Sequence, residues 1–355
     1  MDSRVHGNDR MLFGDYNYFM SQKILVTGGA GYIGSHTVLQ LLKQNCQVIV
    51  LDNLERGYQA ALDRVQELAG KPLIFFQADL RQPETLAPIF ASHSIDAVIH
   101  FAAYKDVGEA DKDPEKYYLN NVVGTLNLLS QMQFHQVKKI VFSSTSAVYG
   151  DADQLPITEQ TPLKPKNAYG RSKAAVEWVL DDYFNSYGIS SVRLRYFNAA
   201  GADPSGKLGE DPRLCGNVIP LVMQTLIGQR DKFLLYGDHF ATPDGTQERD
   251  FIHVADLATA HVASLDKLNQ ISGSFYYNLG TGQPTSVNQI IHLSEEISGK
   301  KLNYQVVDPR PGDALVVYCD PTKAKQELNW EAKLDIHQII SDQWNWVVQN
   351  PQGFA

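Results

Sequence analysis

The sequence contains few cysteines and no long apolar run. Its three cysteines, Cys46, Cys215 and Cys319, lie far apart without metal-ligand spacing, so they support neither a disulfide framework nor a metal site. No apolar run approaches the roughly 18 residues that a membrane span requires. Residues 1–20 also lack the apolar core of a secretory signal, so we expect a disordered extension over residues 1–21, with Met20 as an alternative start. The sequence therefore predicts a cytoplasmic protein with no membrane partner.

Basic residues are in the minority as well. The 31 lysines and arginines are outnumbered by 40 aspartates and glutamates, which gives a net charge of −9. A broad nucleic-acid-binding face needs clustered Lys and Arg, so no nucleic-acid partner is expected. A small anionic substrate stays open, provided that a few local arginines hold it. The length of 355 residues is sufficient for two domains.

Short apolar runs rich in Ile, Val and Phe alternate with longer stretches of helical periodicity. Several runs are apolar at successive positions, which is typical of strands buried on both faces of a parallel sheet. Repeated strand–helix–strand units predict an α/β fold with a doubly wound parallel sheet, which binds ligands at the carboxyl ends of its strands. The expected strands are Ile24–Thr27, Val48–Leu51, Leu73–Gln77, Ala97–Phe101, Lys139–Ser143 and Val192–Phe197, and the expected helices include Tyr32–Lys43 and Tyr117–Met132.

The alternation of apolar runs and helical stretches ends at about residue 200, after which Gly and Pro become frequent. We expect a first, nucleotide-binding domain over residues 22–198 and a smaller α/β substrate domain over residues 199–355. Within a segment of about 250–280, a strand near Ser274–Asn278 is expected to return to the first domain.

A glycine-rich turn follows the first expected strand and opens the first expected helix. Glycines 29, 31 and 34 fit the pattern G-x-G-x-x-G, and Gly28, Gly31 and Gly34 fit a G-x-x-G-x-x-G variant. Such glycines let a pyrophosphate approach the backbone, while the helix N-terminus offers free N–H groups to the phosphates. Asp52 ends the second strand, where an acid holds the adenosine ribose and repels a 2′-phosphate. The pattern predicts NAD as the cofactor, and Asp79 after the third strand is a candidate for holding the adenine.

A tyrosine and a lysine share one helix face further along the chain. Tyr169 and Lys173 are four residues apart, so their side chains point the same way. A neighbouring ammonium and a positive nicotinamide ring favour the phenolate, which makes tyrosine a usable base near neutral pH. Thr145, at the end of the fifth strand, is a candidate for bridging to the same substrate oxygen, with Ser144 and Ser146 as alternatives. These groups predict hydride transfer between an alcohol and a ketone.

The chain from about Lys23 to Phe354 resembles the UDP-glucose 4-epimerases, a family of the extended short-chain dehydrogenase/reductases. The matching motifs are Val26–His36, Leu51–Leu54, Ile99–Ala103 with Lys105 and Val107–Glu109, Asn120–Val122, Val148–Gly150, Arg195–Asn198, Arg249–Val254 and Arg310–Asp313. The resemblance implies an isomerase of galactose metabolism that inverts C4 of a UDP-sugar with bound NAD. It also implies a homodimer built from two helices of each subunit.

The resemblance also implies a role for each matching residue. Thr145, Tyr169 and Lys173 would be catalytic. The NAD site would be formed by Gly28, Gly31, Tyr32, Ile33, Gly34, Asp52, Asn53, Asp79, Leu80, Phe101, Ala102, Lys105, Asn120, Tyr169, Lys173 and Phe197. The UDP-sugar site would be formed by Thr145, Asn198, Asn217, Val218, Leu234, Tyr236, Arg249, Arg310 and Asp313.

Two positions of the sequence bear on the reaction and on substrate specificity. Related dehydratases and decarboxylases carry a glutamate two residues after the strand-end Thr, and this chain has Ala147 there, which argues against both activities. Val317 stands where some relatives place a large tyrosine, which leaves room for an N-acetylated sugar. The alternatives are a 4-epimerase of UDP-GlcNAc, UDP-glucuronate or UDP-xylose, and a catalytically silent NAD-sensing protein.

Overall fold

The computed structural model describes residues 22–214, 216–310 and 314–354. Its larger part contains a sheet of seven strands in the order β10-β6-β5-β4-β1-β2-β3, and every neighbouring pair is parallel. The predicted doubly wound sheet is therefore confirmed. The strands are β1 (Lys23–Thr27), β2 (Gln47–Asp52), β3 (Ile74–Gln77), β4 (Ala97–His100), β5 (Lys139–Ser143), β6 (Ser190–Tyr196) and β10 (Ser274–Leu279).

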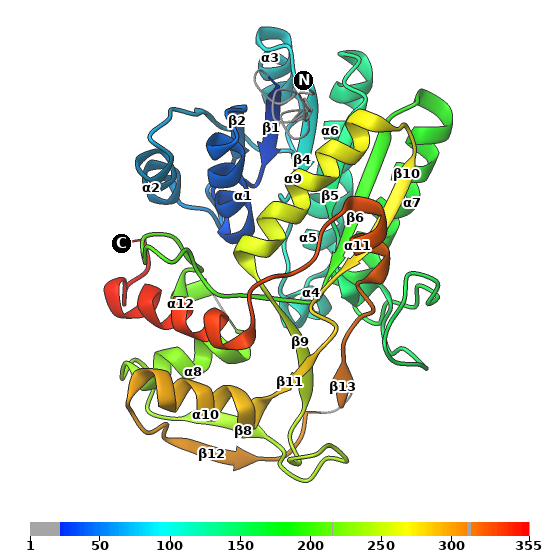
Figure 1. The fold of residues 1–355 in the computed structure, drawn as a ribbon. Helices are drawn as coiled ribbons and strands as arrows, with labels where there is room; N and C mark the ends of the chain where they lie inside the picture. Colours follow the sequence, from blue (N-terminus) through cyan, green and yellow to red (C-terminus); the bar gives the residue numbers. More distant parts are fainter. Residues whose placement is uncertain (1–21, 215, 311–313, 355) are drawn as a thin grey trace, which may run out of the picture.

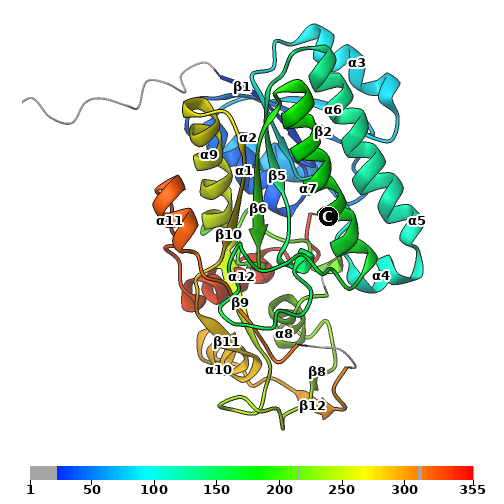
Figure 2. The same cartoon turned by 90° about the vertical axis from the view of Figure 1, so that its right-hand side faces the viewer.

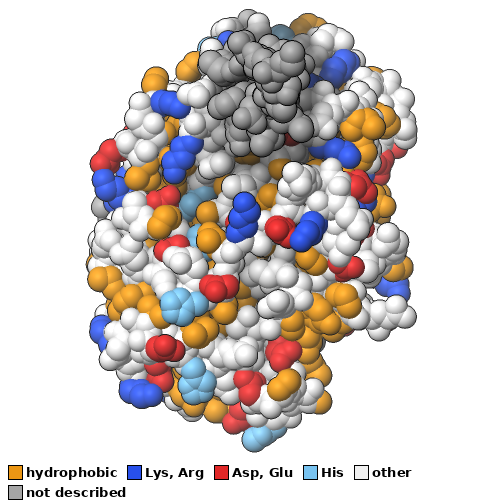
Figure 3. All heavy atoms as spheres, viewed as in Figure 1, with side chains coloured by type: hydrophobic (Ala, Val, Ile, Leu, Met, Phe, Trp, Pro, Cys, Tyr) orange, Lys and Arg blue, Asp and Glu red, His pale blue; other side chains and the backbone are white. Residues whose placement is uncertain are grey.

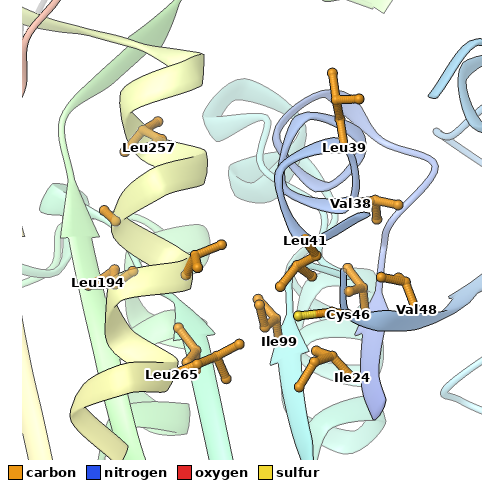
Figure 4. Packing of buried hydrophobic residues seen from close by; sticks show 14 of the residues in the cluster. Ile24, Val38, Leu39, Leu41, Cys46, Val48, Ile99, Leu194, Leu257 and Leu265 are labelled. Atoms are coloured by element: carbon orange, nitrogen blue, oxygen red, sulfur yellow. The ribbon is translucent and has the colours of Figure 1, made fainter. Parts of the chain in front are cut away.

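Helices cover both faces of this sheet, as Figure 2 shows. On one face lie α1 (Tyr32–Lys43), α2 (Gln59–Ala69) and α9 (Val254–Gln270), and on the other lie α3 (Pro83–Ser92), α6 (Gly124–Phe134) and α7 (Ala168–Tyr187). Successive strand residues point to opposite faces, so Ile24 and Val26 join the first core and Leu25 joins the second. Figure 4 shows the first core, in which α1 and α9 pack side by side. Burial on both faces explains the continuous apolar runs.

The strand order reverses at β1, which has β2 on one side and β4 on the other. Such a switch point leaves a crevice outside the carboxyl ends of the strands, where ligands bind. β10 pairs in parallel with β6 at the edge of the sheet, where the sequence predicts a returning strand near Ser274–Asn278. α9 precedes β10 and packs on the same sheet, so residues after 250 contribute to the larger part (Figure 1).

One helix differs from its prediction. The expected helix Tyr117–Met132 is divided into α5 (Pro114–Tyr117), a π-helical turn η1 (Tyr118–Val123) and α6. A π-turn admits an extra residue into the helix and is rarely visible in hydrophobic periodicity. It places Asn121 in the protein interior, where it is 2 % exposed.

The smaller part lies beyond the carboxyl edge of the large sheet (Figure 1). Its core joins α8 (Val218–Leu226), α10 (Val287–Ser298) and α12 (Ile336–Gln349). Its strands are β7 (Asn198–Ala200), β8 (Phe233–Tyr236), β9 (Glu248–His253), β11 (Pro284–Ser286), β12 (Tyr304–Val307) and β13 (Val316–Val317). The remaining elements are α4 (Val107–Lys112), α11 (Thr322–Leu328) and the short turns η2 (Ser146–Val148) and η3 (Pro212–Leu214).

The surface is charged but mixed in sign. On the face drawn in Figure 3, the described lysines and arginines are interspersed with aspartates and glutamates. No helix in the described part of the chain combines the length and apolar character needed to span a bilayer. Within the same residues, no cluster of three or more His, Cys, Asp or Glu side chains is arranged to hold a metal ion.

Candidate active site

A cleft of about 470 Å³ opens at the carboxyl ends of the sheet strands, and residues of the smaller part form its opposite wall. It collects most of the residues that the sequence predicts to bind ligands. Those that line it are Gly28, Gly31, Tyr32, Ile33, Gly34, Asp52, Asn53, Asp79, Leu80, Phe101, Ala102, Lys105, Asn120, Tyr169, Lys173, Asn217 and Arg310.

The glycine turn forms a cradle that side chains would fill. Gly28 has a φ of +72°, and a Cβ there would lie 2.6 Å from the backbone nitrogen of Ala102. A Cβ on Gly34 would lie 2.2 Å from the carbonyl oxygen of Gly28. Helix α1 begins at Tyr32 without a side-chain cap, and Tyr32, Ile33 and Gly34 of its first turn line the cleft. These features fit the pyrophosphate of a dinucleotide such as NAD.

Two carboxylates follow β2 and β3 at the same edge. Asp52 is 7 % exposed, and its Oδ2 and Oδ1 accept hydrogen bonds from the N–H groups of Ala30 (3.0 Å) and Leu54 (2.9 Å). Burial raises the pKa of Asp52, and these two bonds oppose the rise. Each oxygen keeps a lone pair for a ribose hydroxyl. A hydrogen bond from Arg81 holds the pKa of Asp79 at about 2, so Asp79 is ionised at neutral pH.

Helix α7 brings Tyr169 and Lys173 to the floor of the cleft. The Asn167 side chain accepts a hydrogen bond from the Gly170 N–H at 2.8 Å, which caps the helix and places Tyr169 in its first turn. Lys173 Nζ donates to the Ser143 carbonyl oxygen at 2.8 Å and lies 4.6 Å from the centre of the Phe142 ring. Tyr169 is 8 % exposed and Lys173 is 4 % exposed. Both side chains are therefore buried at the inner end of the cleft.

The strand-end hydroxyls have different partners. Ser143 Oγ donates to the Tyr196 hydroxyl at 3.0 Å, and Ser144 Oγ donates to Glu177 at 2.5 Å. Burial raises the pKa of Tyr169, and the side chain of Thr145 is close enough to the Tyr169 hydroxyl to oppose part of that rise. Among the hydroxyls left open by the sequence, Thr145 is therefore the one coupled to the tyrosine.

Burial changes the pKa values of Tyr169 and Lys173 in opposite directions. Burial raises the pKa of Tyr169, the nearby Tyr196 raises it further, and the side chain of Thr145 opposes the rise only in part. The same burial lowers the pKa of Lys173 to about 7, against an opposing effect of Glu177. In its ammonium form Lys173 favours the phenolate of Tyr169, and the positive nicotinamide ring of bound NAD would act in the same direction.

The residues expected to bind the sugar nucleotide are more dispersed. The Arg310 guanidinium lies 4.6 Å from the centre of the Tyr236 ring, so these two are brought together. Arg249 donates from Nη2 to the Ala314 carbonyl oxygen at 2.8 Å. Thr145, Phe197, Asn198, Val218, Leu234, Tyr236 and Arg249 do not line the cleft, and Asp313 lies outside the described residues.

Comparisons with known proteins agree with this geometry. A family model described as GDP-mannose 4,6 dehydratase matches residues 25–343. A UDP-glucose 4-epimerase of Cyamopsis tetragonoloba is 48 % identical over 94 % of this chain and 97 % of its own length. The enzyme of that name from Bacillus subtilis is 46 % identical over 93 % of this chain and 98 % of its own. The crystal structure of UDP-glucose 4-epimerase from Bifidobacterium longum in complex with NAD+ and UDP has a TM-score of 0.89 at 44 % identity, covering 94 % of this chain and all of that one.

The chain belongs to the UDP-glucose 4-epimerase family. The matching family model takes its name from a dehydratase, but a dehydratase needs an acid beside the strand-end hydroxyl. Position 147 is alanine, and Thr145 Oγ1 accepts a hydrogen bond from its N–H at 3.2 Å. An epimerase of this family needs no such acid, because no hydroxyl group is expelled.

Sequence reasoning missed several residues of the cleft. Tyr196 ends β6 and lines the cleft beside Tyr169, a position that the strand-end rule could have flagged. Glu210, Asp211 and Phe354 line the opposite wall and come from irregular segments without a periodic signal. Glu210 reaches across the cleft to Lys105, with an N–O distance of 2.6 Å.

Proposed function

We propose that this protein is an NAD-dependent UDP-glucose 4-epimerase, which interconverts UDP-glucose and UDP-galactose. The observation that carries the proposal is the placement of Tyr169 and Lys173 in one cleft with the glycine cradle of α1. Family membership over nearly the whole chain supports the same reaction. NAD held by the glycine cradle of α1 and by Asp52 would supply the hydride chemistry at C4 of the sugar.

The residues of the chain handle the proton. Tyr169 takes the proton of the C4 hydroxyl when the sugar is oxidised and returns it on reduction. Thr145 shares the hydrogen bond to that oxygen. Lys173, fixed by the Ser143 carbonyl, presents its ammonium to this group and stabilises the phenolate. The low exposure of both side chains keeps water from the reacting carbon while the 4-keto sugar turns over.

The UDP group is held by the wall formed by the smaller part. Arg310 and Asn217 line the cleft there, and a guanidinium suits a diphosphate because it donates several parallel hydrogen bonds. Asn217 precedes α8 without capping it, so its side chain is not used by the helix. Holding the nucleotide at one end leaves the hexose able to present either face to the cofactor.

A panel of UDP-sugars assayed without added NAD tests this function. We expect UDP-galactose to appear from UDP-glucose without net formation of NADH, because the reaction returns the cofactor unchanged. Turnover of UDP-glucuronate or UDP-xylose in place of UDP-glucose would assign another 4-epimerase. No turnover of any sugar by protein that contains NAD would favour the silent NAD-sensing protein.

The small side chain at Val317 favours N-acetylated UDP-sugars as a second class of substrate. Its half-buried side chain packs against a cluster that includes Phe197, Val148 and Cys319. One structural relative, from Campylobacter jejuni, is titled a UDP-Glc/GlcNAc 4-epimerase and is 37 % identical. A valine side chain is smaller than tyrosine, so it would leave more room for the acetamido group of UDP-GlcNAc than the tyrosine of some relatives.

Replacing Val317 by tyrosine is expected to lower turnover of UDP-GlcNAc at least tenfold while UDP-glucose turnover stays within about threefold. The larger ring fills the space needed by the acetamido group, and steric exclusion in a packed pocket is worth about 1–3 kcal/mol. Val317→Ala is the matched control and should keep both activities. If wild-type protein that converts UDP-glucose shows no turnover of UDP-GlcNAc, this substrate class is wrong.

The exposed apolar side chains of η1 and α7 suit a homodimer. Tyr118, Leu119 and Val123 on η1 are 39 %, 48 % and 40 % exposed, and Trp178 on α7 is 57 % exposed. η1 and α7 pack against each other, so these side chains are carried on adjacent elements. Apolar groups gathered in this way mark a protein interface, and a second copy of the chain buries them by twofold symmetry.

Charged residues in the patch formed by the exposed apolar side chains of η1 and α7 should give a monomer. We expect Leu119→Glu combined with Trp178→Glu to halve the mass measured by light scattering after gel filtration, because burying two unpaired charges is costly. Ile271→Glu is the control, since Ile271 is 50 % exposed at the end of α9, on the other face of the sheet. Equal masses for the double variant and this control would exclude the patch as the interface.

A further inference from the structure

A buried carboxylate lies one helical turn beyond Lys173. Glu177 is 1 % exposed and follows Tyr169 and Lys173 at four-residue spacing on α7. Its Oε2 accepts a hydrogen bond from Arg195 Nη2 at 2.5 Å, and its Oε1 accepts from Ser144 Oγ at 2.5 Å. Three elements therefore meet at one carboxylate: helix α7, the end of β5 and the end of β6.

The two side chains that donate to the Glu177 carboxylate, Ser144 and Arg195, are each the chain neighbour of a residue in the candidate site. Ser144 precedes Thr145, and Arg195 precedes Tyr196, which lines the cleft. Arg195 also donates from Nη1 to the Tyr149 hydroxyl at 3.0 Å, and that hydroxyl donates to Asn278 of β10 at 2.7 Å. The carboxylate is thus fixed in a network that extends across the edge of the sheet.

We propose that Glu177 is a positioning residue of the epimerisation site, which holds Thr145 and Tyr196 in place and keeps Lys173 in its ammonium form. It touches neither substrate nor cofactor and acts through these three residues. The inference rests on the proposed function, because its reaction is the C4 epimerisation described above.

Among the described residues, Glu177 is the negatively charged group that acts on Lys173. On α7, Tyr169 and Glu177 lie four residues before and after Lys173, while Tyr196 of β6 acts on Tyr169 and Arg195 of β6 pairs with Glu177. His100 of β4 is buried with a pKa lowered to about 3, so it is neutral, and β5 offers only the Ser143 carbonyl and the Phe142 ring. Tyr117 of α5 lies near Tyr169 and is neutral, because burial raises its pKa.

The direction of the effect follows from this arrangement. Burial lowers the pKa of Lys173 to about 7, and the Glu177 charge opposes that fall. Without the carboxylate, the pKa of Lys173 falls further and Arg195 becomes an uncompensated positive charge. The active ammonium is then lost at a lower pH than in the wild-type protein.

The decisive experiment compares two isosteric variants of α7 as NAD-loaded protein. For Glu177→Gln we expect kcat with UDP-glucose to fall at least tenfold near pH 8, with KM within about threefold and the descending limb of the kcat–pH profile moved down by about one pH unit. Asp181→Asn is the matched control. Asp181 lies four residues on and pairs with Arg193 of β6 at 2.9 Å, and its variant should keep the wild-type rate and pH profile.

A loss of structure is separated from a loss of positioning by a second variant. Removing one partner of a buried ion pair destabilises a protein, whereas replacing both by apolar residues is often tolerated. If Glu177→Gln does not fold, Glu177→Leu with Arg195→Met removes both charges, and its folded form should keep the low kcat and the shifted limb. A wild-type kcat and pH profile in either folded variant would overturn the proposal. Absence of turnover by the wild-type protein would instead overturn the proposed function.

Discussion

Turnover of UDP-glucose is expected to fall by about 10³-fold or more when Tyr169 is replaced by phenylalanine. The substitution removes the hydroxyl that accepts the C4 proton, and proton transfer by a positioned side chain contributes about 10²–10⁴-fold in enzymes. The ring keeps its packing against Tyr104, Tyr117 and Ala168, so the fold should persist. The measurement is kcat for UDP-galactose formation, with the NAD content determined on the same preparation.

The neighbouring Tyr117 provides a control from the same aromatic cluster. Its hydroxyl donates to the Asp106 carbonyl oxygen at 2.5 Å, and the residue does not line the cleft. Tyr117→Phe should therefore lose about 1 kcal/mol of stability and keep kcat within about fivefold. An unchanged rate in Tyr169→Phe would remove the tyrosine from the mechanism.

Loss of NAD is the expected result of replacing Gly34 by alanine. The added Cβ would lie 2.2 Å from the Gly28 carbonyl oxygen and 2.9 Å from Gly29 Cα. Both are backbone atoms, so the clash cannot be relieved by rotating a side chain. The start of α1 must therefore move away from the glycine turn, and its N–H groups are no longer placed to donate hydrogen bonds to the pyrophosphate. We expect at least 100-fold weaker NAD binding, measured by titration and by the cofactor content of the purified protein.

Gly216 supplies the matched control for this substitution. It also lines the cleft, but a Cβ added there meets no atom within 4 Å. Gly216→Ala should keep its NAD, and thermal unfolding of both variants shows whether the fold is intact. A Gly34→Ala protein that is purified with its full complement of NAD would contradict the role given to the cradle.

The large sheet could be predicted because its signal is local. β5 has the predicted bounds, α1 is found at Tyr32–Lys43 as predicted, and the glycine turn lies between β1 and α1. The π-turn at η1 was missed because one extra residue barely changes the apolar periodicity. Predicted domain limits at residues 198 and 199 stay predictions, since α9 and β10 join the large sheet from later in the chain.

The candidate site was predictable wherever a residue ends a strand or starts a helix of the sheet. Tyr169, Asp52, Gly28, Gly31 and Gly34 are such residues, and these five line one cleft. The pKa of Tyr169 could not be predicted, because it depends on how deeply α7 is buried and not on spacing. Glu210 could not be predicted from the sequence either, because only folding brings its carboxylate to within 2.6 Å of Lys105 Nζ.

The contacts across the cleft have a consequence for how the enzyme relates to cell metabolism. The Tyr32 hydroxyl donates to the Gly201 carbonyl at 2.6 Å, and the Lys105–Glu210 pair spans the same opening. Two walls joined in this way would hinder the escape of a bound dinucleotide, and a redox-neutral isomerisation needs no exchange of that cofactor. The flux through the enzyme would then follow the supply of sugar nucleotides and be insulated from swings in the cellular balance between oxidised and reduced nicotinamide.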